Sequence, residues 1–196
     1  MKEIKKYAIH ILAVPAMTEE AFDLPHSQCA IIRLCDRSNA FLDTTDILQL
    51  SFNVLDIEDA AIPGSMTAAH ARLILRFIEG LPAEVTDIYV CCSKGGSRSA
   101  GCAAALLLIS GRSDMDVWKN PFYVPNALVF YRICTEFGLK MTWEDVQERS
   151  RTNEEAFAEA QEKGKQVTSD GRYFCRLAGE CSRVCCLVLF REILNK

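Results

Sequence analysis

The chain has 196 residues, of which 49% are hydrophobic and 24% are charged, a balance typical of a globular protein rather than a disordered one. Its formal net charge of -4, without any long basic run, argues against non-specific binding to nucleic acid. No apolar run approaches the ~20 residues of a membrane-spanning helix. We therefore expect a folded protein with no nucleic-acid partner and no transmembrane segment.

Four short apolar runs are typical of buried strands in a parallel sheet. They are residues 7–14, 29–35, 47–55 and 87–92. Between the third run and the fourth, apolar residues at helical spacing predict a helix over residues 66–79. Ser65 or Thr67 is expected to cap this helix, and Gly80 to end it.

The region after the fourth run supplies two more helices. The segment SAGCAAALLLIS predicts a buried helix that stops at Gly111, and a further helix begins near Pro125 and ends at Gly138. Strands that alternate with helices predict an α/β fold class. We expect a central, mostly parallel sheet of four to five strands, flanked by helices on both of its faces.

The last fifty-odd residues differ in character. Residues 142–165 are rich in Glu, Arg and Lys and predict a solvated helix. Residues 173–196 space their apolar side chains at helical intervals, which favours a terminal helix that docks on the domain, forms a homodimer face or attaches to a membrane surface. The sequence thus predicts an α/β domain over residues 1–140 and a helical C-terminal extension, residues 141–196, packed on the same domain.

Cysteine usage and the N-terminus indicate the compartment. The ten cysteines are not evenly spaced, and several lie in apolar segments as small core residues: Cys29, Cys35, Cys102 and Cys134. No pair of CxxC motifs occurs and the three histidines are scattered, so no metal site is predicted. Glu3 and His10 interrupt a pattern that otherwise resembles a secretion signal. We expect reduced thiols in a cytoplasmic protein.

The turn between the fourth strand and the buried helix carries the chemistry. A glycine-containing loop at this position points successive backbone N–H groups inward, and the positive end of the helix dipole adds to them. The loop residues expected to bind an oxyanion substrate are Ser93, Lys94, Gly95, Gly96, Ser97 and Arg98. The planar fork of Arg98 matches two phosphate oxygens. The same field would lower the pKa of the Cys92 thiol, which makes it a nucleophile for attack on phosphorus.

Residues 92–99, CSKGGSRS, match the pattern C-x-x-G-x-x-R-S, a C-x5-R motif. This segment, called the signature loop below, resembles that of the cysteine-dependent protein tyrosine and dual-specificity phosphatases. The resemblance extends loosely from about residue 28 to about residue 138, and the PNALVFYR helix is similar to bacterial members. It implies a phosphatase-like fold and an enzyme in which Cys92 forms a phosphocysteine intermediate, while Arg98 and the loop backbone hold the phosphoryl oxygens. It also implies that Ser99 hydrogen-bonds the departing thiolate and that no cofactor or metal ion is needed.

The sequence departs from the family at two points. The family usually has His immediately before the nucleophile, where this chain has Cys91. Cys91 either fills the end of the strand or exchanges a disulfide with oxidised Cys92, with Cys102 as a rival resolving thiol. The family also carries a general acid some thirty-odd residues upstream. Asp59 lies 33 residues before Cys92 and Asp56 lies 36 before it. We favour Asp59 narrowly, and Asp56 remains open.

These observations predict a protein phosphatase that hydrolyses either phosphotyrosine alone or phosphotyrosine together with phosphoserine and phosphothreonine. Its partners would be phosphorylated proteins or small phosphoesters. One alternative is a pseudophosphatase that binds phosphate without turnover, because the His is absent and the acid is ambiguous. Another is a phosphatase for a different oxyanion substrate, such as a phosphoinositide or arsenate.

Overall fold

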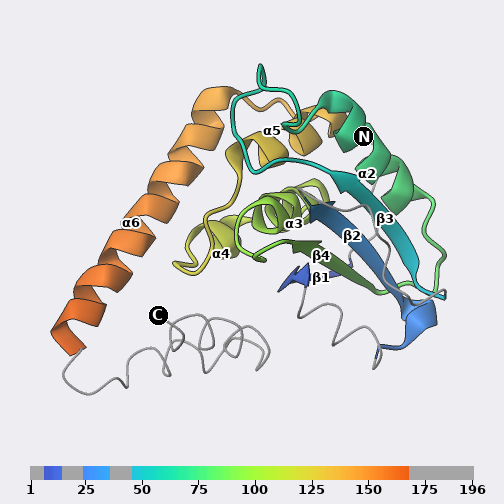
Figure 1. Ribbon diagram of the computed structural model, residues 1–196, viewed down its shortest axis with the longest axis horizontal. Coiled ribbons are helices and arrows are strands. Elements are labelled where there is room, and N and C mark those ends of the chain that lie inside the picture. The colour runs from blue at the N-terminus through green and yellow to red at the C-terminus, as the bar shows by residue number, and fades with distance from the viewer. Residues whose placement is uncertain (1–6, 15–23, 36–45, 168–196) are drawn as a thin grey trace.

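The computed structural model describes residues 7–14, 24–35 and 46–167, and at its centre lies a four-stranded parallel sheet (Figure 1). The strands are β1 (Ala8–Ala13), β2 (Cys29–Cys35), β3 (Leu48–Asn53) and β4 (Asp87–Cys92). Their spatial order is β1-β4-β2-β3, so β4 lies inside the sheet. Cys92, the last residue of β4, is in register with Ala13 of β1 and Leu34 of β2. The α/β fold class and the four predicted strands are confirmed.

The helices follow the local sequence signals closely. They are the short 3-10 helix η1 (His26–Gln28) and the α-helices α2 (Ala68–Glu79), α3 (Arg98–Ile109), α4 (Met115–Trp118), α5 (Ala127–Phe137) and α6 (Trp143–Val167). Of the two candidate caps of α2, Thr67 is the one used: its side chain accepts from the His70 amide, and the His70 ring accepts from the Thr67 amide. Gly138, with φ of 96°, ends α5. The four-residue α4 was not predicted, because one turn is too short to show periodicity.

The main core lies between one face of the sheet and the helices. Alternate residues of the two inner strands point to this face, among them Ile32 of β2 and Val90 of β4. They pack against side chains such as Ile74 of α2 and Phe130 of α5, all fully buried. Within the part of the chain that the structure describes, the α-helices α2 to α6 gather on this one face (Figure 1).

The opposite face of the sheet carries a separate, smaller cluster. Its buried members include Leu12 of β1, Ile31 of β2, and Tyr89 and Cys91 of β4. Cys91 and Cys92 thus point to opposite faces, as neighbours in a strand must. Helices were expected on both faces of the sheet. In the described residues, 7–14, 24–35 and 46–167, they cover the face to which Cys92 points.

The first turns of the long helix α6 are docked on the domain. Val146 is fully buried and Asn153 is 5% exposed, whereas most side chains between Glu154 and Glu162 are exposed. In the region predicted as a solvated helix, the N-terminal part is therefore packed. The predicted helix over 173–196, and the homodimer expected through it, lie outside the described residues. Over the described residues, no helix combines the length and the apolar character that a membrane crossing requires.

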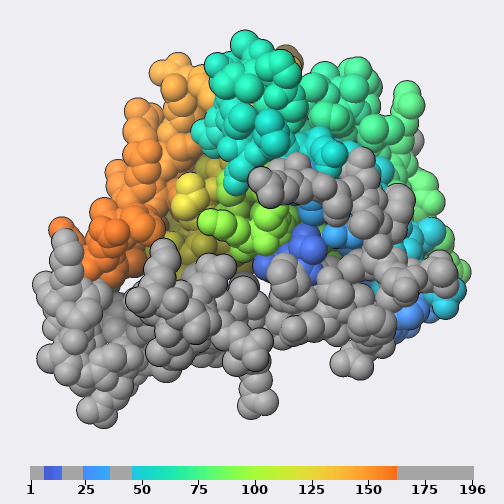
Figure 2. Space-filling model, in the orientation of Figure 1, coloured from blue at the N-terminus to red at the C-terminus, as the bar shows by residue number. Residues whose placement is uncertain are grey.

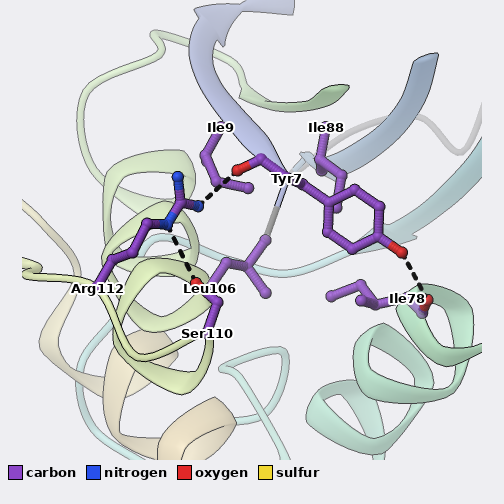
Figure 3. Close-up of a pocket in the computed structure, with 7 residues that line it drawn as sticks. All are labelled: Tyr7, Ile9, Ile78, Ile88, Leu106, Ser110 and Arg112. Atoms are coloured by element: carbon purple, nitrogen blue, oxygen red, sulfur yellow. Dashed lines mark hydrogen bonds between the residues drawn. The ribbon is translucent and has the colours of Figure 1, made fainter. Parts of the chain in front are cut away.

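A small pocket lies at the amino ends of β1 and β4, far along the sheet from the signature loop (Figure 3). Its lining includes Tyr7, Ile88, Leu106 and Arg112. Arg112 donates to the backbone carbonyl of Tyr7 at 2.6 Å, and the Tyr7 hydroxyl donates to the carbonyl of Ile78. These bonds tie the start of β1 to the ends of α2 and α3, so Arg112 has a structural role here.

Candidate active site

The signature loop joins the carboxyl end of β4 to the N-terminus of α3. Open α/β sheets bind ligands at this end of their strands. Gly95 has φ of +72°, and a Cβ atom there would lie 2.6 Å from the backbone nitrogen of Ala13. A Cβ atom at Gly101, in the first turn of α3, would collide with the carbonyl oxygen of Asn126. Only glycine allows the loop to pack this closely against β1 and α3 against the start of α5.

Cys92 lies at the base of a ring of hydrogen-bond donors. Its side chain is 1% exposed, and its sulfur is 3.2 Å from the hydroxyl oxygen of Ser99. Burial acts to raise the pKa of the Cys92 thiol, but hydrogen bonds to the sulfur outweigh it and hold the pKa below its ordinary value. The donors are the hydroxyl and the amide of Ser99 and the amides of Ser97 and Lys94.

The N-terminus of α3 is left available to an anion. Ser97 occupies the N-cap position, yet its side chain makes no capping hydrogen bond, and no acidic residue lies in the first turn. The Ser97 hydroxyl instead donates to Asp56 at 2.7 Å. The amides at this end of α3 and the dipole of the helix therefore act on the sulfur and on the space around it. This arrangement can stabilise a thiolate and a bound oxyanion together.

Hydrogen bonds to a backbone carbonyl and to a hydroxyl hold the guanidinium of Arg98 at the signature loop. Its guanidinium is buried, and Nη1 donates to the carbonyl of Val54 at 2.6 Å while Nη2 donates to the hydroxyl of Ser93 at 3.1 Å. Nε is 3.9 Å from a carboxylate oxygen of Asp56. These contacts fix the planar fork in one orientation at the loop, which lowers the entropy lost when it binds an anion.

Asp56 is the upstream carboxylate that the structure brings to the signature loop. One of its oxygens accepts both from the Ser97 hydroxyl and from the side-chain amide of Asn126, the latter at 3.0 Å. Asn126 is 1% exposed, and its own side-chain oxygen caps α5 by accepting from Val129. Sequence reasoning missed Asn126. Its position before an apolar helix signals an N-cap, but its bond to Asp56 depends on tertiary packing.

Asp59 lies farther along the same loop, which was expected to carry the general acid. Its side chain is exposed, and its carboxylate accepts from the backbone amide of Ala61, two residues on. Glu58, between the two candidates, accepts from the amide of Ala127 at the start of α5 at 2.6 Å. The segment after β3 is therefore fastened to α5 as well as to the signature loop. Figure 2 shows the segment that follows β4, in light green, at the surface between the teal segment after β3 and the yellow one before α5.

The thiols proposed as redox partners of Cys92 are both fully buried. Burial, with the nearby Cys35 thiol, raises the pKa of Cys91 to about 12, although Arg33 acts in the opposite direction. Burial also raises the pKa of Cys102. Because the thiolate is the form that attacks a disulfide or a sulfenic acid, both groups are poor resolving nucleophiles near neutral pH. This favours a packing role for Cys91 at the end of the strand.

The remaining predicted residues are placed as follows. Lys94 is exposed at the rim of the loop, and Gly96 accepts a hydrogen bond through its carbonyl from the amide of Val124 at 2.8 Å.

Among residues 7–14, 24–35 and 46–167, no three His, Cys, Asp or Glu side chains gather in a way that would hold a metal ion.

Comparison with known proteins gives distant structural likenesses. No family model matches the chain, and no curated protein matches it. The crystal structure of PTPMT1 in complex with PI(5)P is 18% identical, with a TM-score of 0.43 over 81% of this chain and 97% of that one. The crystal structure of Tk-PTP in the active form is also 18% identical, with a TM-score of 0.40 over 77% and 92%.

Proposed function

We propose that this protein is a cysteine-dependent phosphatase that hydrolyses phosphotyrosine in proteins through a phosphocysteine intermediate. One observation carries the proposal: backbone amides of the signature loop converge on the sulfur of Cys92, whose thiol pKa is lowered despite its burial. A buried thiol in this electrostatic environment is a candidate nucleophile, because the thiolate is the reactive form.

The first step transfers the phosphoryl group to the enzyme. The loop amides and the guanidinium of Arg98 bind the non-bridging oxygens and stabilise the charge that they carry in the transition state. The Cys92 thiolate attacks phosphorus as the bond to the tyrosine oxygen breaks. A carboxylic acid donates its proton to that oxygen, so the dephosphorylated hydroxyl leaves neutral.

The second step regenerates the thiolate. A water molecule attacks the phosphocysteine, the acid residue, now a carboxylate, accepts the proton, and inorganic phosphate leaves. The P–S bond breaks with its electron pair on sulfur, and the Ser99 hydroxyl stabilises the charge that returns there, as its 3.2 Å separation from the sulfur allows.

We assign the acid role to Asp59 and a holding role to Asp56. Asp56 accepts from Ser97 and Asn126 and lies beside Arg98, so its oxygens are already committed to the loop. Within the described residues, the side chain of Asp59 accepts one local hydrogen bond, from the amide of Ala61, which it would give up on binding substrate. Loss of the true acid removes the fall in activity at high pH and slows esters of alcohols with high pKa more than esters of acidic phenols. Asp59→Asn should show both effects and Asp56→Asn neither. If the fall in activity at high pH disappears in Asp56→Asn alone, the assignment is reversed.

The proposal is tested by hydrolysis of an aryl phosphate in the presence of EDTA. Wild-type protein should release phosphate and, with a ³²P-labelled substrate, form a radiolabelled covalent adduct on rapid quenching in SDS that survives alkaline pH and is lost in mild acid. Cys92→Ser should abolish both. Cys91→Ala is the matched control, because it removes the adjacent thiol from the opposite face of the sheet. Full activity in Cys92→Ser, or equal loss in both variants, would exclude the mechanism. Phosphotyrosine, phosphoserine and phosphothreonine peptides and phosphoinositides then define the substrate class.

A second candidate function is oxyanion binding without turnover. It is favoured by the engagement of both carboxylates in hydrogen bonds, at Asp56 with the loop and at Asp59 with its own turn. It predicts that tungstate or phosphate binds tightly, by calorimetry, to a wild-type protein that hydrolyses no substrate of the panel. Steady-state turnover of any one of these substrates would eliminate this candidate.

A further inference from the structure

The turn before α5, which contains Tyr123 and Val124, holds the outward-facing side of the signature loop. The Ser97 amide is directed at the sulfur of Cys92. In a trans peptide the C=O and N–H groups point in opposite directions, so the carbonyl of Gly96, in the same peptide unit, must face away from the sulfur. That carbonyl accepts from the amide of Val124 at 2.8 Å. The turn thus holds the peptide unit that presents an amide to the site.

The same turn also accepts a hydrogen bond from a side chain of α6. The carbonyl of Tyr123, which belongs to one peptide unit with the Val124 amide, accepts from the side-chain amide of Asn153 at 3.0 Å. Asn153 comes from α6 and is 5% exposed. Its amide also donates to the carbonyl of Trp118 at 2.8 Å. In Figure 1, α4 lies between α6 and α3, so α6 reaches the turn across the end of α4.

A continuous series of hydrogen bonds therefore runs from α6 to the nucleophile. The Asn153 amide donates to the 123–124 peptide unit, which donates to the 96–97 unit, which donates to the sulfur of Cys92. Each peptide unit accepts on one side and donates on the other, so the bonds polarise one another and share one geometry. Without the first donor, the 123–124 peptide unit loses its bond to α6, and the 96–97 unit loses the polarisation and support that this bond gives.

We propose that Asn153 is a positioning residue for the signature loop, acting from outside the strand–loop–helix motif through two peptide units. The inference rests on the proposed function for its consequence in turnover, but the coupling itself is a property of the folded chain. It makes α6 part of the catalytic apparatus. The alternative is that Asn153 only anchors α6 to the turn, in which case its loss lowers stability and leaves the loop unchanged.

Two variants remove successive donors of the series. Asn153→Ala deletes the side-chain amide. Val124→Pro deletes the backbone N–H that holds the Gly96 carbonyl, at a side chain that is 63% exposed, so little packing is lost. The matched control is Thr152→Ala, the neighbouring residue of α6, whose hydroxyl donates to the carbonyl of Glu148 within the same helix. Circular dichroism and thermal unfolding identify the variants that fold.

The readouts are the pH profile of iodoacetamide alkylation at Cys92 and the affinity for tungstate, neither of which requires turnover. In both variants, the alkylation midpoint should move to higher pH and tungstate should bind about fivefold more weakly, the equivalent of one net hydrogen bond. Thr152→Ala should match the wild type. Where a substrate is turned over, KM should rise with the tungstate constant.

Several results would overturn the inference. One is a folded Asn153→Ala with the wild-type alkylation profile and tungstate affinity, even if its melting temperature falls. If Asn153→Ala does not fold, an unchanged profile in Val124→Pro has the same force. A wild-type protein that turns over no substrate would defeat the proposed function, whereas the alkylation profiles would still decide the role of Asn153.

Discussion

The hydrogen bond between Ser99 and Cys92 makes a quantitative prediction. Ser99 is fully buried, and its hydroxyl oxygen lies 3.2 Å from the sulfur. Ser99→Ala removes this donor and keeps the helix and the other amides. A hydrogen bond to a charged group is worth about 1.5–3 kcal/mol, and about 1.4 kcal/mol corresponds to one pKa unit. Because the lost bond stabilises the thiolate, the pKa of Cys92 should rise by about one to two units.

The assay is the rate of alkylation by iodoacetamide as a function of pH, since only the thiolate reacts. The chain has ten cysteines, so tandem mass spectrometry must assign the modification to Cys92 rather than to Cys91. Cys91, with a pKa raised to about 12 chiefly by burial, should contribute little below pH 9. Ser110→Ala is the control at the other end of α3, where the hydroxyl donates to the carbonyl of Leu107. A midpoint in Ser99→Ala that moves by less than about half a unit would refute the reasoning.

Three further predictions concern stability. Gly95→Ala should cost about 2 kcal/mol or more and weaken tungstate binding, because φ is +72° and the new Cβ meets the backbone of β1; urea unfolding and calorimetry measure the two effects. Arg149→Met should cost about 2–3 kcal/mol in urea unfolding, because it leaves the 4% exposed carboxylate of Asp114 without its 2.7 Å partner; an unchanged midpoint would contradict it. Burial raises the pKa of Cys91 to about 12, so the folded state keeps a proton that the unfolded state loses above about pH 9. The stability that this thiol contributes is complete below that pH and is lost as pH rises. Between about pH 9 and 11, the free energy of unfolding should therefore fall less steeply with pH in Cys91→Ala than in the wild type, and the two slopes should differ by about 1.4 kcal/mol per pH unit.

The parts of the site that lie close together in sequence were accessible without a structure. The order of strand, glycine loop and helix, and the spacing of Cys92 and Arg98 within it, follow from local chain geometry. Successive side chains of a strand point to opposite faces of the sheet, so neighbouring Cys91 and Cys92 must also face opposite ways. Apolar patterning, together with capping and stop signals, located α2, α3, α5 and the four strands, because these signals lie within each element.

Other features depended on contacts between distant segments. The sequence leaves open whether Asp56 or Asp59 serves the site. The structure brings Asp56 to Ser97, 41 residues away, and to Asn126, 70 residues away. Asn153 and Tyr123, 30 residues apart, meet in the same way. No periodic pattern encodes such pairs, because a single buried amide looks the same in sequence whether it caps a helix or holds a loop.

By itself, then, the sequence determined the α/β class and the order of strand, glycine loop and helix, and it placed Cys92, the proposed nucleophile, next to the loop whose amides surround its sulfur, since all of these arise from residues within a few turns of one another. Only the tertiary structure decided that β4 lies inside the sheet, that Asp56 is fastened to the loop, and that α6 contacts the turn behind it. The reason is physical: local geometry is limited by the backbone and by a repeat of two or 3.6 residues, whereas the partner of a buried polar group is fixed only when the whole core has packed.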